Sequence, residues 1–264
     1  MIENTGGEGK LERIHVQVSP DLGEVARQAA DLFVELCQAI TGAGQVFSVA
    51  LSGGSTPRAL HQLLSSAPYR ERVDWSRVRF FFGDERYVPE ADTMSNYRMA
   101  HETLLEPLGV DPSRIFRMPT TELGSPALAA ARYEDDLRAA FELSAGQLPQ
   151  FDLILLGLGP DGHTASLFPH TEALSVSDRL VAANFVPKLD AYRITLTVPV
   201  INNAAVVAFL VAGSDKASAL GSVLLGPRDP DEFPAQLVLP TDGDLYWLVD
   251  QAAAAGLAQA RPDQ

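Results

Sequence analysis

A histidine in a glycine-rich segment occupies the position in this sequence where a catalytic base is most easily placed. The apolar residues 151–156 (FDLILL) indicate a strand buried on both faces, and residues 157–164 (GLGPDGHT) follow it directly. In an open parallel sheet, ligands bind beside the loops at the carboxyl ends of the strands. His163 comes two residues after Asp161, so this pattern predicts a general base with a carboxylate that can orient it.

A second strand end has the residues of an anion-binding turn. Residues 46–51 indicate a strand, and SGGSTP follows at 52–57, before a helix expected over 57–64. Glycines let the backbone approach a ligand, and a helix N-terminus offers unpaired N–H groups to a phosphate. The segment has neither the spacing nor the lysine of a nucleotide P-loop, and an ordinary strand–helix turn capped by Thr56 is the alternative. The predicted phosphate-binding residues of this turn are Ser52, Gly53, Gly54, Ser55 and Thr56.

Charged residues follow a third expected strand, over residues 78–82. Asp84, Glu85 and Arg86 come at its end, where a solvated loop with a local ion pair is the simple interpretation. Their position matches that of the other two loops, which favours a role in the same site. The forked donors of Arg86 suit an anionic or carbonyl oxygen. Downstream, residues 95–96 (SN) are in a position to close over this site.

Two basic residues are further candidates. Arg193 begins a strand expected over residues 193–198. Lys216 lies just after a strand expected over 206–211, at the start of a helix expected over 215–225. Both positions suit a cation that binds a phosphate, and a surface charge without such a role is the alternative for each.

The remaining histidines and the cysteine do not form a second site. Three histidines lie within strand or helix patterns and are expected at the surface, and the fourth has no evident role (His15, His61, His101 and His170). Cys37, the only cysteine, has helical spacing with Phe33 and Ile40, so we expect it to be buried and unreactive. No group of residues has the spacing of a metal site.

The charge of the chain restricts its partners. Its 264 residues carry a formal net charge of −14, which disfavours binding to nucleic acids and to anionic membranes. An anionic substrate must therefore be held by backbone N–H groups and a few converging cations. No apolar run is long enough to span a membrane, and residues 1–10 lack the apolar stretch of a signal peptide, so a cytoplasmic protein is expected.

Strand and helix patterns alternate along most of the chain, which predicts a mostly parallel sheet covered by helices. A helix capped by Ser19 is expected to begin at Pro20 and to end at residues 41–44 (TGAG). Residues 226–234 read as a loop and not as a domain linker. We therefore expect a disordered tail over residues 1–12 and a single α/β domain over 13–264. The other expected elements are helices over 96–105 and 127–143, a strand over 245–249 and an alanine-rich C-terminal helix.

Taken together, these motifs resemble those of the glucosamine-6-phosphate isomerase/6-phosphogluconolactonase superfamily, and in particular its 6-phosphogluconolactonases. The resemblance covers roughly residues 15–252 in a consistent order, and its most specific part is GLGPDGHTASLFP at 157–169. The matching segments also include SGGSTP at 52–57, GDER at 83–86, SNY at 95–97, RITL at 193–196 and GSDK at 213–216.

Two departures from the related deaminases bear on the reaction. In glucosamine-6-phosphate deaminases the histidine block continues into Phe-Asn-Glu-Pro, with a functional glutamate. Here Phe168 stands in place of that glutamate, and Asp84-Glu85-Arg86 replaces the Asp-Glu-Tyr of the deaminases. Both differences favour hydrolysis of a lactone over ring opening and deamination.

The resemblance implies a modified Rossmann-type three-layer sandwich that binds no nucleotide. It also implies that a monomer without a cofactor hydrolyses 6-phospho-D-glucono-1,5-lactone to 6-phospho-D-gluconate, in the oxidative pentose phosphate pathway. In this interpretation His163 is the general base and Asp161 orients it. Arg86 acts near the lactone and Asp84 holds Arg86 in place. The turn at 52–56 then binds the phosphate with Arg193 and Lys216.

Three other functions are alternatives to this one. A deaminase-like isomerase acting on a related sugar phosphate is the main alternative. A non-catalytic sensor of sugar phosphates would keep the cations but would not need His163 beside Asp161. A nicotinamide-dependent oxidoreductase would need a GxGxxG fingerprint, which is missing.

Overall fold

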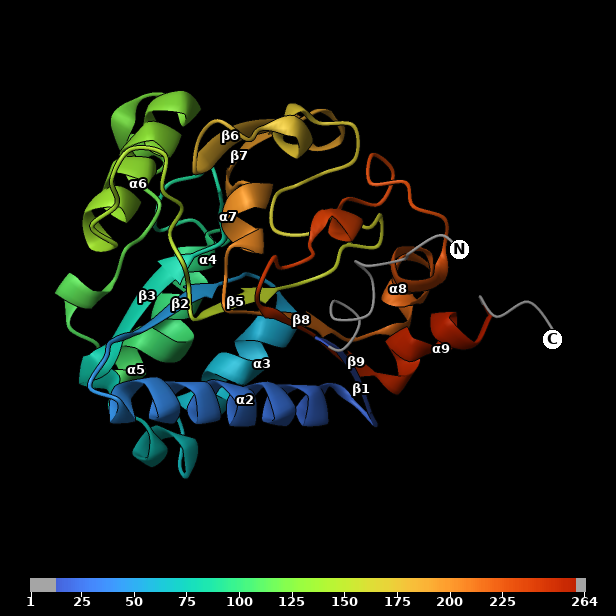
Figure 1. Cartoon of the computed structure of the whole chain (residues 1–264), viewed down its shortest axis with the longest axis horizontal. Helices are drawn as coiled ribbons and strands as arrows, with labels where there is room; N and C mark the ends of the chain where they lie inside the picture. Colours follow the sequence, from blue (N-terminus) through green and yellow to red (C-terminus); the bar gives the residue numbers. More distant parts are fainter. Residues whose placement is uncertain (1–12, 260–264) are drawn as a thin grey trace, which may run out of the picture.

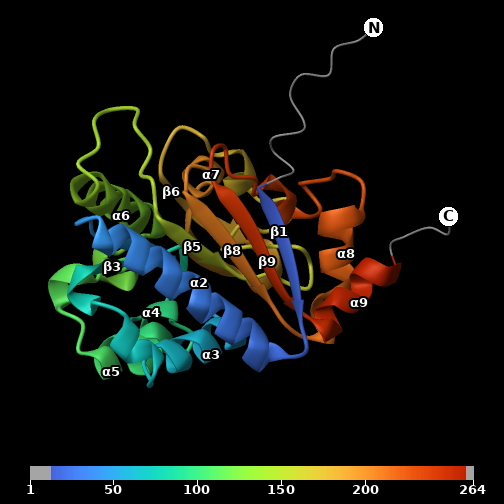
Figure 2. The same ribbon diagram turned by 60° about the horizontal axis from the view of Figure 1, so that its bottom comes forward.

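A six-stranded sheet runs through the middle of the protein, and every strand pairing within it is parallel (Figure 1, Figure 2). The computed structural model describes residues 13–259, and the expected tail over residues 1–12 lies outside them. The strand order is β1-β9-β8-β5-β2-β3. The strands of this sheet are β1 (Ile14–Ser19), β2 (Phe47–Leu51), β3 (Val78–Phe82), β5 (Leu153–Leu156), β8 (Val206–Val211) and β9 (Asp244–Asp250).

Helices lie on both sides of this sheet. In Figure 1, α2 and α3 lie below it, whereas α6 and α7 lie above it. Helices α8 and α9 pack against each other near the β1–β9 edge. The predicted α/β class, with a mostly parallel sheet flanked by helices, is confirmed. The helices are α2 (Leu22–Gly42), α3 (Ser55–Leu64), α4 (Asn96–Ala100), α5 (Glu106–Leu108), α6 (Pro126–Ala140), α7 (Val198–Asn202), α8 (Ala217–Leu225) and α9 (Gln251–Gln259).

A small antiparallel sheet, which the sequence did not predict, lies above the main sheet in Figure 1. Its order is β4-β7-β6, formed by β4 (Asp84–Arg86), β7 (Ala191–Leu196) and β6 (Val181–Val186). The prediction of a loop at residues 84–86 is therefore wrong, and the strand that holds Arg193 belongs to this sheet and not to the parallel one. Three charged residues show no strand pattern by themselves, so β4 exists because β7 pairs with it.

The first helix begins later than predicted. Ser19 is the last residue of β1, which pairs with β9 along its whole length. Asp21 is the N-cap, and its carboxylate accepts a hydrogen bond of 3.0 Å from the Glu24 backbone N–H. Strand β1 has no continuous apolar run, because it is an edge strand whose residues are mostly half-buried or exposed.

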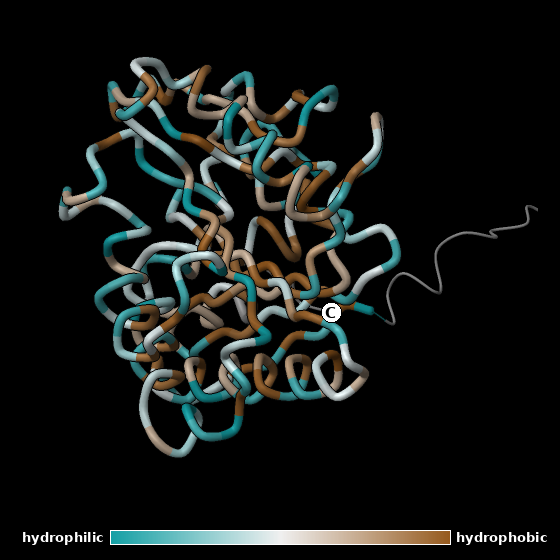
Figure 3. Tube along the Cα trace, turned by 90° about the vertical axis from the view of Figure 1, so that its left-hand side faces the viewer, coloured by the Kyte–Doolittle hydropathy of each residue, from teal (hydrophilic) through white to brown (hydrophobic). Residues whose placement is uncertain are grey.

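The core fills the space between the parallel sheet and its helices. Apolar segments run through the middle of the chain trace, while much of the periphery is hydrophilic (Figure 3). The rings of Phe209 and Trp247, on neighbouring strands, stack with their centroids 3.9 Å apart. No helix within residues 13–259 is both long enough and apolar enough to cross a membrane.

Of two predictions about residues outside the predicted site, one is confirmed and one is wrong. Cys37 is buried as predicted, and burial raises the pKa of its thiol to about 12, so the thiol is unreactive at neutral pH. His61 is wholly buried, so the prediction of a surface position is wrong. Its Nδ1 lies 3.2 Å from the Thr103 hydroxyl, and burial lowers the pKa of the imidazole to about 3. A histidine on the inner side of a helix can be neutral and packed, which its spacing alone does not reveal.

The topology explains why distant segments meet. Strands β8, β5, β2 and β3 are consecutive neighbours in a parallel sheet, so their carboxyl ends lie along one edge. The segments that follow these four strands are 212–216, 157–164, 52–54 and 83–86, in the same order. These segments contain the predicted site residues, except for Arg193 on β7 and for Ser55 and Thr56, which lie in α3.

Candidate active site

Two adjoining pockets lie at this edge of the sheet. One has a volume of about 250 Å³ and the other about 410 Å³. Both are lined by Asp84, Arg86 and His163, so they form two sides of one cleft around these residues. The first side is completed by the turn at residues 52–54 and Lys216, and the second by Asp161, Lys188 and Arg193 among others.

The glycine-rich loop after β5 presents His163 to both sides of the cleft. Its Nδ1 lies 2.5 Å from Asp161 Oδ1, and its ring stacks on Phe168 with the centroids 4.0 Å apart. The Gly159 N–H donates to the His163 carbonyl at 2.8 Å, which closes the loop. A Cβ on Gly159 would overlap the imidazole ring, so only glycine allows the ring to lie in this position.

The surroundings of His163 favour its neutral form. Burial is the main cause and lowers the pKa of the imidazole to about 4. The positive charges of Lys216, Arg193 and Arg86 act in the same direction, while Asp84 opposes them. With Nδ1 donating to Asp161, the Nε2 atom of the neutral ring is left as a proton acceptor.

This environment predicts the titration of His163. We expect its imidazole to remain neutral from pH 8 down to about pH 5 and to take up a proton only near pH 4, measured by NMR of the ring signals in the ligand-free protein. Because an unfolded chain binds this proton at about pH 6.5, the folded protein should lose stability between about pH 6.5 and pH 4. A titration midpoint at 6.5 or above would contradict the effect of burial.

Asp84 is held at the base of the cleft by two neighbours. Its Oδ2 accepts a hydrogen bond of 2.6 Å from the Ser166 hydroxyl. The Asn96 side-chain amide donates a hydrogen bond of 3.0 Å to the backbone carbonyl of Asp84. The same amide nitrogen lies 3.3 Å from Oδ1 of the Asp84 side chain. Gly53 packs so closely on Asn96 that a Cβ there would overlap the amide oxygen. Of the two residues predicted to close over the site, Asn96 lines the cleft, whereas Ser95 is bonded to Glu85 and does not line it.

Glu85 has a structural role that the sequence did not indicate. Its carboxylate is buried and accepts hydrogen bonds from the backbone N–H groups of Arg86, Asn96 and Tyr97, and from the Ser95 hydroxyl, at 2.7–2.9 Å. Burial raises the pKa of this carboxyl, while the four hydrogen bonds act against that change. The carboxylate thus fastens the start of α4 to β4 and so fixes the position of Asn96 in the cleft.

Positive side chains line the cleft on both sides. Arg86 and Arg193 are directly opposite each other on β4 and β7, a like-charge pairing that is unfavourable without an anion nearby. Burial first, and Arg86 second, lower the pKa of Arg193. Arg86 donates to the Met94 carbonyl, and Lys216 pairs with the exposed Asp215 at 3.0 Å. Lys188, which no sequence pattern singled out, pairs with Asp161.

The turn after β2 has free donors next to Lys216. Helix α3 begins at Ser55 with Gly54 as N-cap, and no side chain caps it. The Ser52 hydroxyl is buried and has no hydrogen-bond partner within the described part of the chain. Of the five predicted residues of this turn, Ser52, Gly53 and Gly54 line the cleft. Ser55, which is exposed, and Thr56, which is buried, do not line it.

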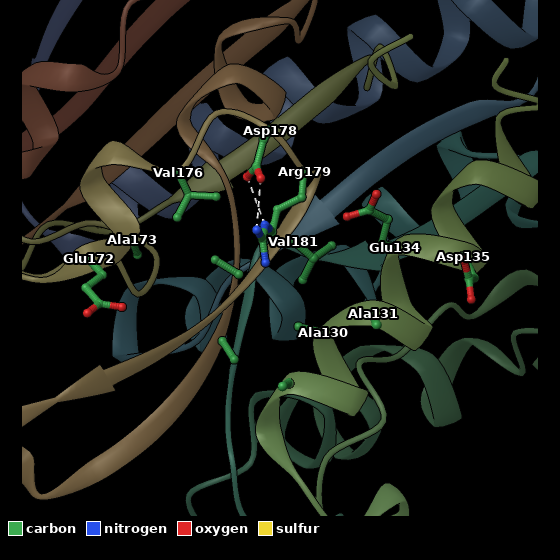
Figure 4. Close-up of a pocket in the computed structure, with 13 residues that line it drawn as sticks. Ala130, Ala131, Glu134, Asp135, Glu172, Ala173, Val176, Asp178, Arg179 and Val181 are labelled. Carbon is green, nitrogen blue, oxygen red and sulfur yellow. Dashed lines mark hydrogen bonds and ion pairs between the residues drawn. The ribbon is translucent and has the colours of Figure 1, made fainter. Parts of the chain in front are cut away.

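A separate pocket of about 550 Å³ lies between α6 and β6 (Figure 4). Its lining combines small apolar side chains with Glu134, Asp135 and Glu172, and its Arg179 is paired with Asp178 at 2.9 Å. It contains no histidine, and none of the predicted site residues reaches it. Among residues 13–259 no group of three histidine, cysteine, aspartate or glutamate side chains is placed to hold a metal ion.

Comparisons with known proteins identify the family of this chain. The family model described as glucosamine-6-phosphate isomerases/6-phosphogluconolactonase matches residues 20–247. A 6-phosphogluconolactonase of Synechocystis sp. is 42% identical over 233 residues, which are 88% of this chain and 93% of the relative. One of Nostoc sp. is 40% identical over 244 residues, covering 92% and 98% of the two chains. The crystal structure of 6-phosphogluconolactonase from Leishmania guyanensis has a TM-score of 0.81 at 29% identity, covering 92% of this chain and 98% of the other. The chain therefore belongs to the glucosamine-6-phosphate isomerase/6-phosphogluconolactonase family and, within it, to the 6-phosphogluconolactonases.

Proposed function

We propose that this protein hydrolyses 6-phospho-D-glucono-1,5-lactone with His163 as the general base. The observation that carries this proposal is the position of His163, whose Nδ1 lies 2.5 Å from Asp161 in a cleft that also contains Arg86, Arg193 and Lys216. Hydrolysis of a lactone needs a base for water, donors for the oxyanion and a means of holding the distal phosphate. The cleft has a candidate for each of these tasks.

In the proposed reaction His163 first accepts a proton and then donates it. His163 Nε2 takes a proton from a water molecule as the water oxygen adds to the lactone carbon C1. The bond between C1 and the ring oxygen then breaks, and the proton passes from His163 to that oxygen, which becomes the 5-hydroxyl of the product. Asp161 keeps Nδ1 as the donor throughout and stabilises the transient imidazolium.

Arg86 is the proposed donor to the oxyanion. It lines both sides of the cleft together with His163. One N–H of its guanidinium donates to the Met94 carbonyl, and the guanidinium has further N–H groups to offer to a substrate oxygen. Asp84, held by Ser166 and Asn96, lines both sides of the cleft with Arg86, and its negative charge is the proposed means of keeping the guanidinium there. A charged donor aimed at the developing negative charge lowers the barrier.

The phosphate is proposed to lie at the turn of residues 52–54 with Lys216. The start of α3, the unpartnered Ser52 hydroxyl and the Lys216 ammonium are the donors on this side of the cleft. Arg193 lines the other side, so it is a weaker candidate for the phosphate than the sequence suggested. Holding the phosphate away from the reacting carbon fixes the orientation of the lactone.

Replacing Lys216 with alanine tests this placement. We expect kcat/KM for the phosphorylated lactone to fall by about 10- to 100-fold, because a charge-assisted hydrogen bond contributes about 1.5–3 kcal/mol. Hydrolysis of glucono-1,5-lactone, which has no phosphate, should change by less than about threefold, and both rates can be followed by acid release at constant pH. An equal loss with both substrates would place Lys216 elsewhere.

Deamination of glucosamine 6-phosphate is the reaction to exclude. Release of ammonia by the purified protein, at a rate comparable with its lactone hydrolysis, would favour the isomerase/deaminase activity instead. Phe168 supports hydrolysis, because its ring packs on His163 where a carboxylate of the deaminase pattern would stand.

A further inference from the structure

Lys188 joins a separate part of the fold to the proposed catalytic pair. It lies in the short 3-10 turn Pro187–Leu189, which connects β6 to β7 at the tip of the hairpin. Its ammonium pairs with Asp161, which in turn contacts Nδ1 of His163 through its other oxygen. Nothing in the sequence around residue 188 indicated this contact.

The same aromatic ring supports both ends of this chain of contacts. The Lys188 Nζ lies 5.0 Å from the centroid of Phe168, and the His163 ring stacks on Phe168 at 4.0 Å. Lys188, Asp161, His163 and Phe168 all line the second side of the cleft. The lysine side chain is half-exposed, whereas the side chains of Asp161 and His163 are each 26% exposed.

The charges that face His163 come from five places in the fold. Asp161 is on its own loop, and Lys188 lies behind that carboxylate on the β6–β7 hairpin. The others are Asp84 and Arg86 on β4, Arg193 on β7 and Lys216 before α8. A carboxylate 2.5 Å from a half-buried imidazole would by itself favour protonation of the ring, so another group must offset the charge of Asp161 if His163 is to stay a free base.

We infer that Lys188 is a positioning residue: it holds Asp161 as the acceptor for the His163 Nδ1–H and offsets its charge, so that Nε2 stays unprotonated at neutral pH. Burial of the ring acts in the same direction. The inference deepens the proposed function, on which the role of Nε2 as the base rests. Its alternative is that Lys188 contacts the substrate, since it also faces the cleft.

The test compares Lys188→Met, which removes the charge at similar length, with Lys188→Arg, which keeps it. Arg179→Met is the matched control, because it removes one positive charge from an exposed pair outside this cleft. The ring signals of His163 are titrated by NMR in the ligand-free proteins, and kcat and KM for the phosphorylated lactone are measured from pH 5 to 8. Lys188→Gln is a second charge-free variant in case the methionine variant does not fold.

The expected result is a rise of about 1 pH unit in the titration midpoint of His163 in Lys188→Met and in Lys188→Gln, with little change in Lys188→Arg and Arg179→Met. An unchanged midpoint in the charge-free variants would overturn the inference. An unchanged midpoint together with a raised KM would assign Lys188 to the substrate instead. The titration needs no turnover, so loss of the proposed function and loss of this inference give different results.

Discussion

Replacing His163 with alanine is expected to lower kcat for hydrolysis of the phosphorylated lactone by about 10²- to 10⁴-fold, the usual contribution of a general base. KM should change little, because the proposed phosphate site at the turn of residues 52–54 and Lys216 is unaffected. The measurement is the initial rate of acid release at pH 7, corrected for spontaneous opening of the lactone. Glutamine at this position should have a similar effect, since it preserves the volume of the side chain but cannot accept the proton.

His170 provides the control. Its side chain is 68% exposed, lies 3.0 Å from Glu232 and lines neither side of the cleft, so His170→Ala should keep the wild-type kcat. A His163→Ala protein that is folded and retains more than about a tenth of the wild-type kcat would remove the imidazole from the chemical step. The proposed function would then need another base, and Asp84 is the remaining buried carboxylate that lines the cleft.

Replacing Glu85 with alanine is expected to have the largest effect on stability. The change leaves the buried Asn96 N–H and Ser95 hydroxyl without their acceptor, together with the half-buried N–H groups of Arg86 and Tyr97. Each unsatisfied buried donor costs about 1–3 kcal/mol, so we expect the free energy of unfolding to fall by about 3 kcal/mol or more, measured by urea denaturation. Glutamine should not restore it, because its amide presents a donor to groups that are themselves donors.

Activity should fall together with stability in the Glu85→Ala protein. Once the start of α4 is released, Asn96 no longer holds Asp84 at the base of the cleft. Glu71→Ala is the matched control, since this glutamate is exposed and the same substitution there should change stability by less than about 0.5 kcal/mol. If Glu85→Ala lowers stability no more than Glu71→Ala does, the buried carboxylate is not what fastens α4 to β4.

Much of the site could be predicted because each motif is local. The buried runs that form β2, β3, β5 and β8 can be read from the sequence, and in a parallel sheet their carboxyl ends must lie on one edge. The sequence alone therefore indicates that Ser52, Asp84, His163 and Lys216 lie near one another, and all four line the first side of the cleft. The α/β class and the family follow from the same alternation and motifs, and both are confirmed.

The tertiary structure decided the features that depend on contacts between residues far apart in the sequence. Strands β4 and β6 have no strong pattern of their own and form through pairing with β7, which sets Arg193 opposite Arg86. The contact of Lys188 with Asp161 needs the hairpin to fold over the glycine-rich loop. The burial of Glu85 and His61 also depends on what packs against them from elsewhere in the chain. A sequence specifies strands and turns through periodicity and propensity over a few residues, whereas pairing, burial and proton affinity are set by neighbours that only the folded chain brings together.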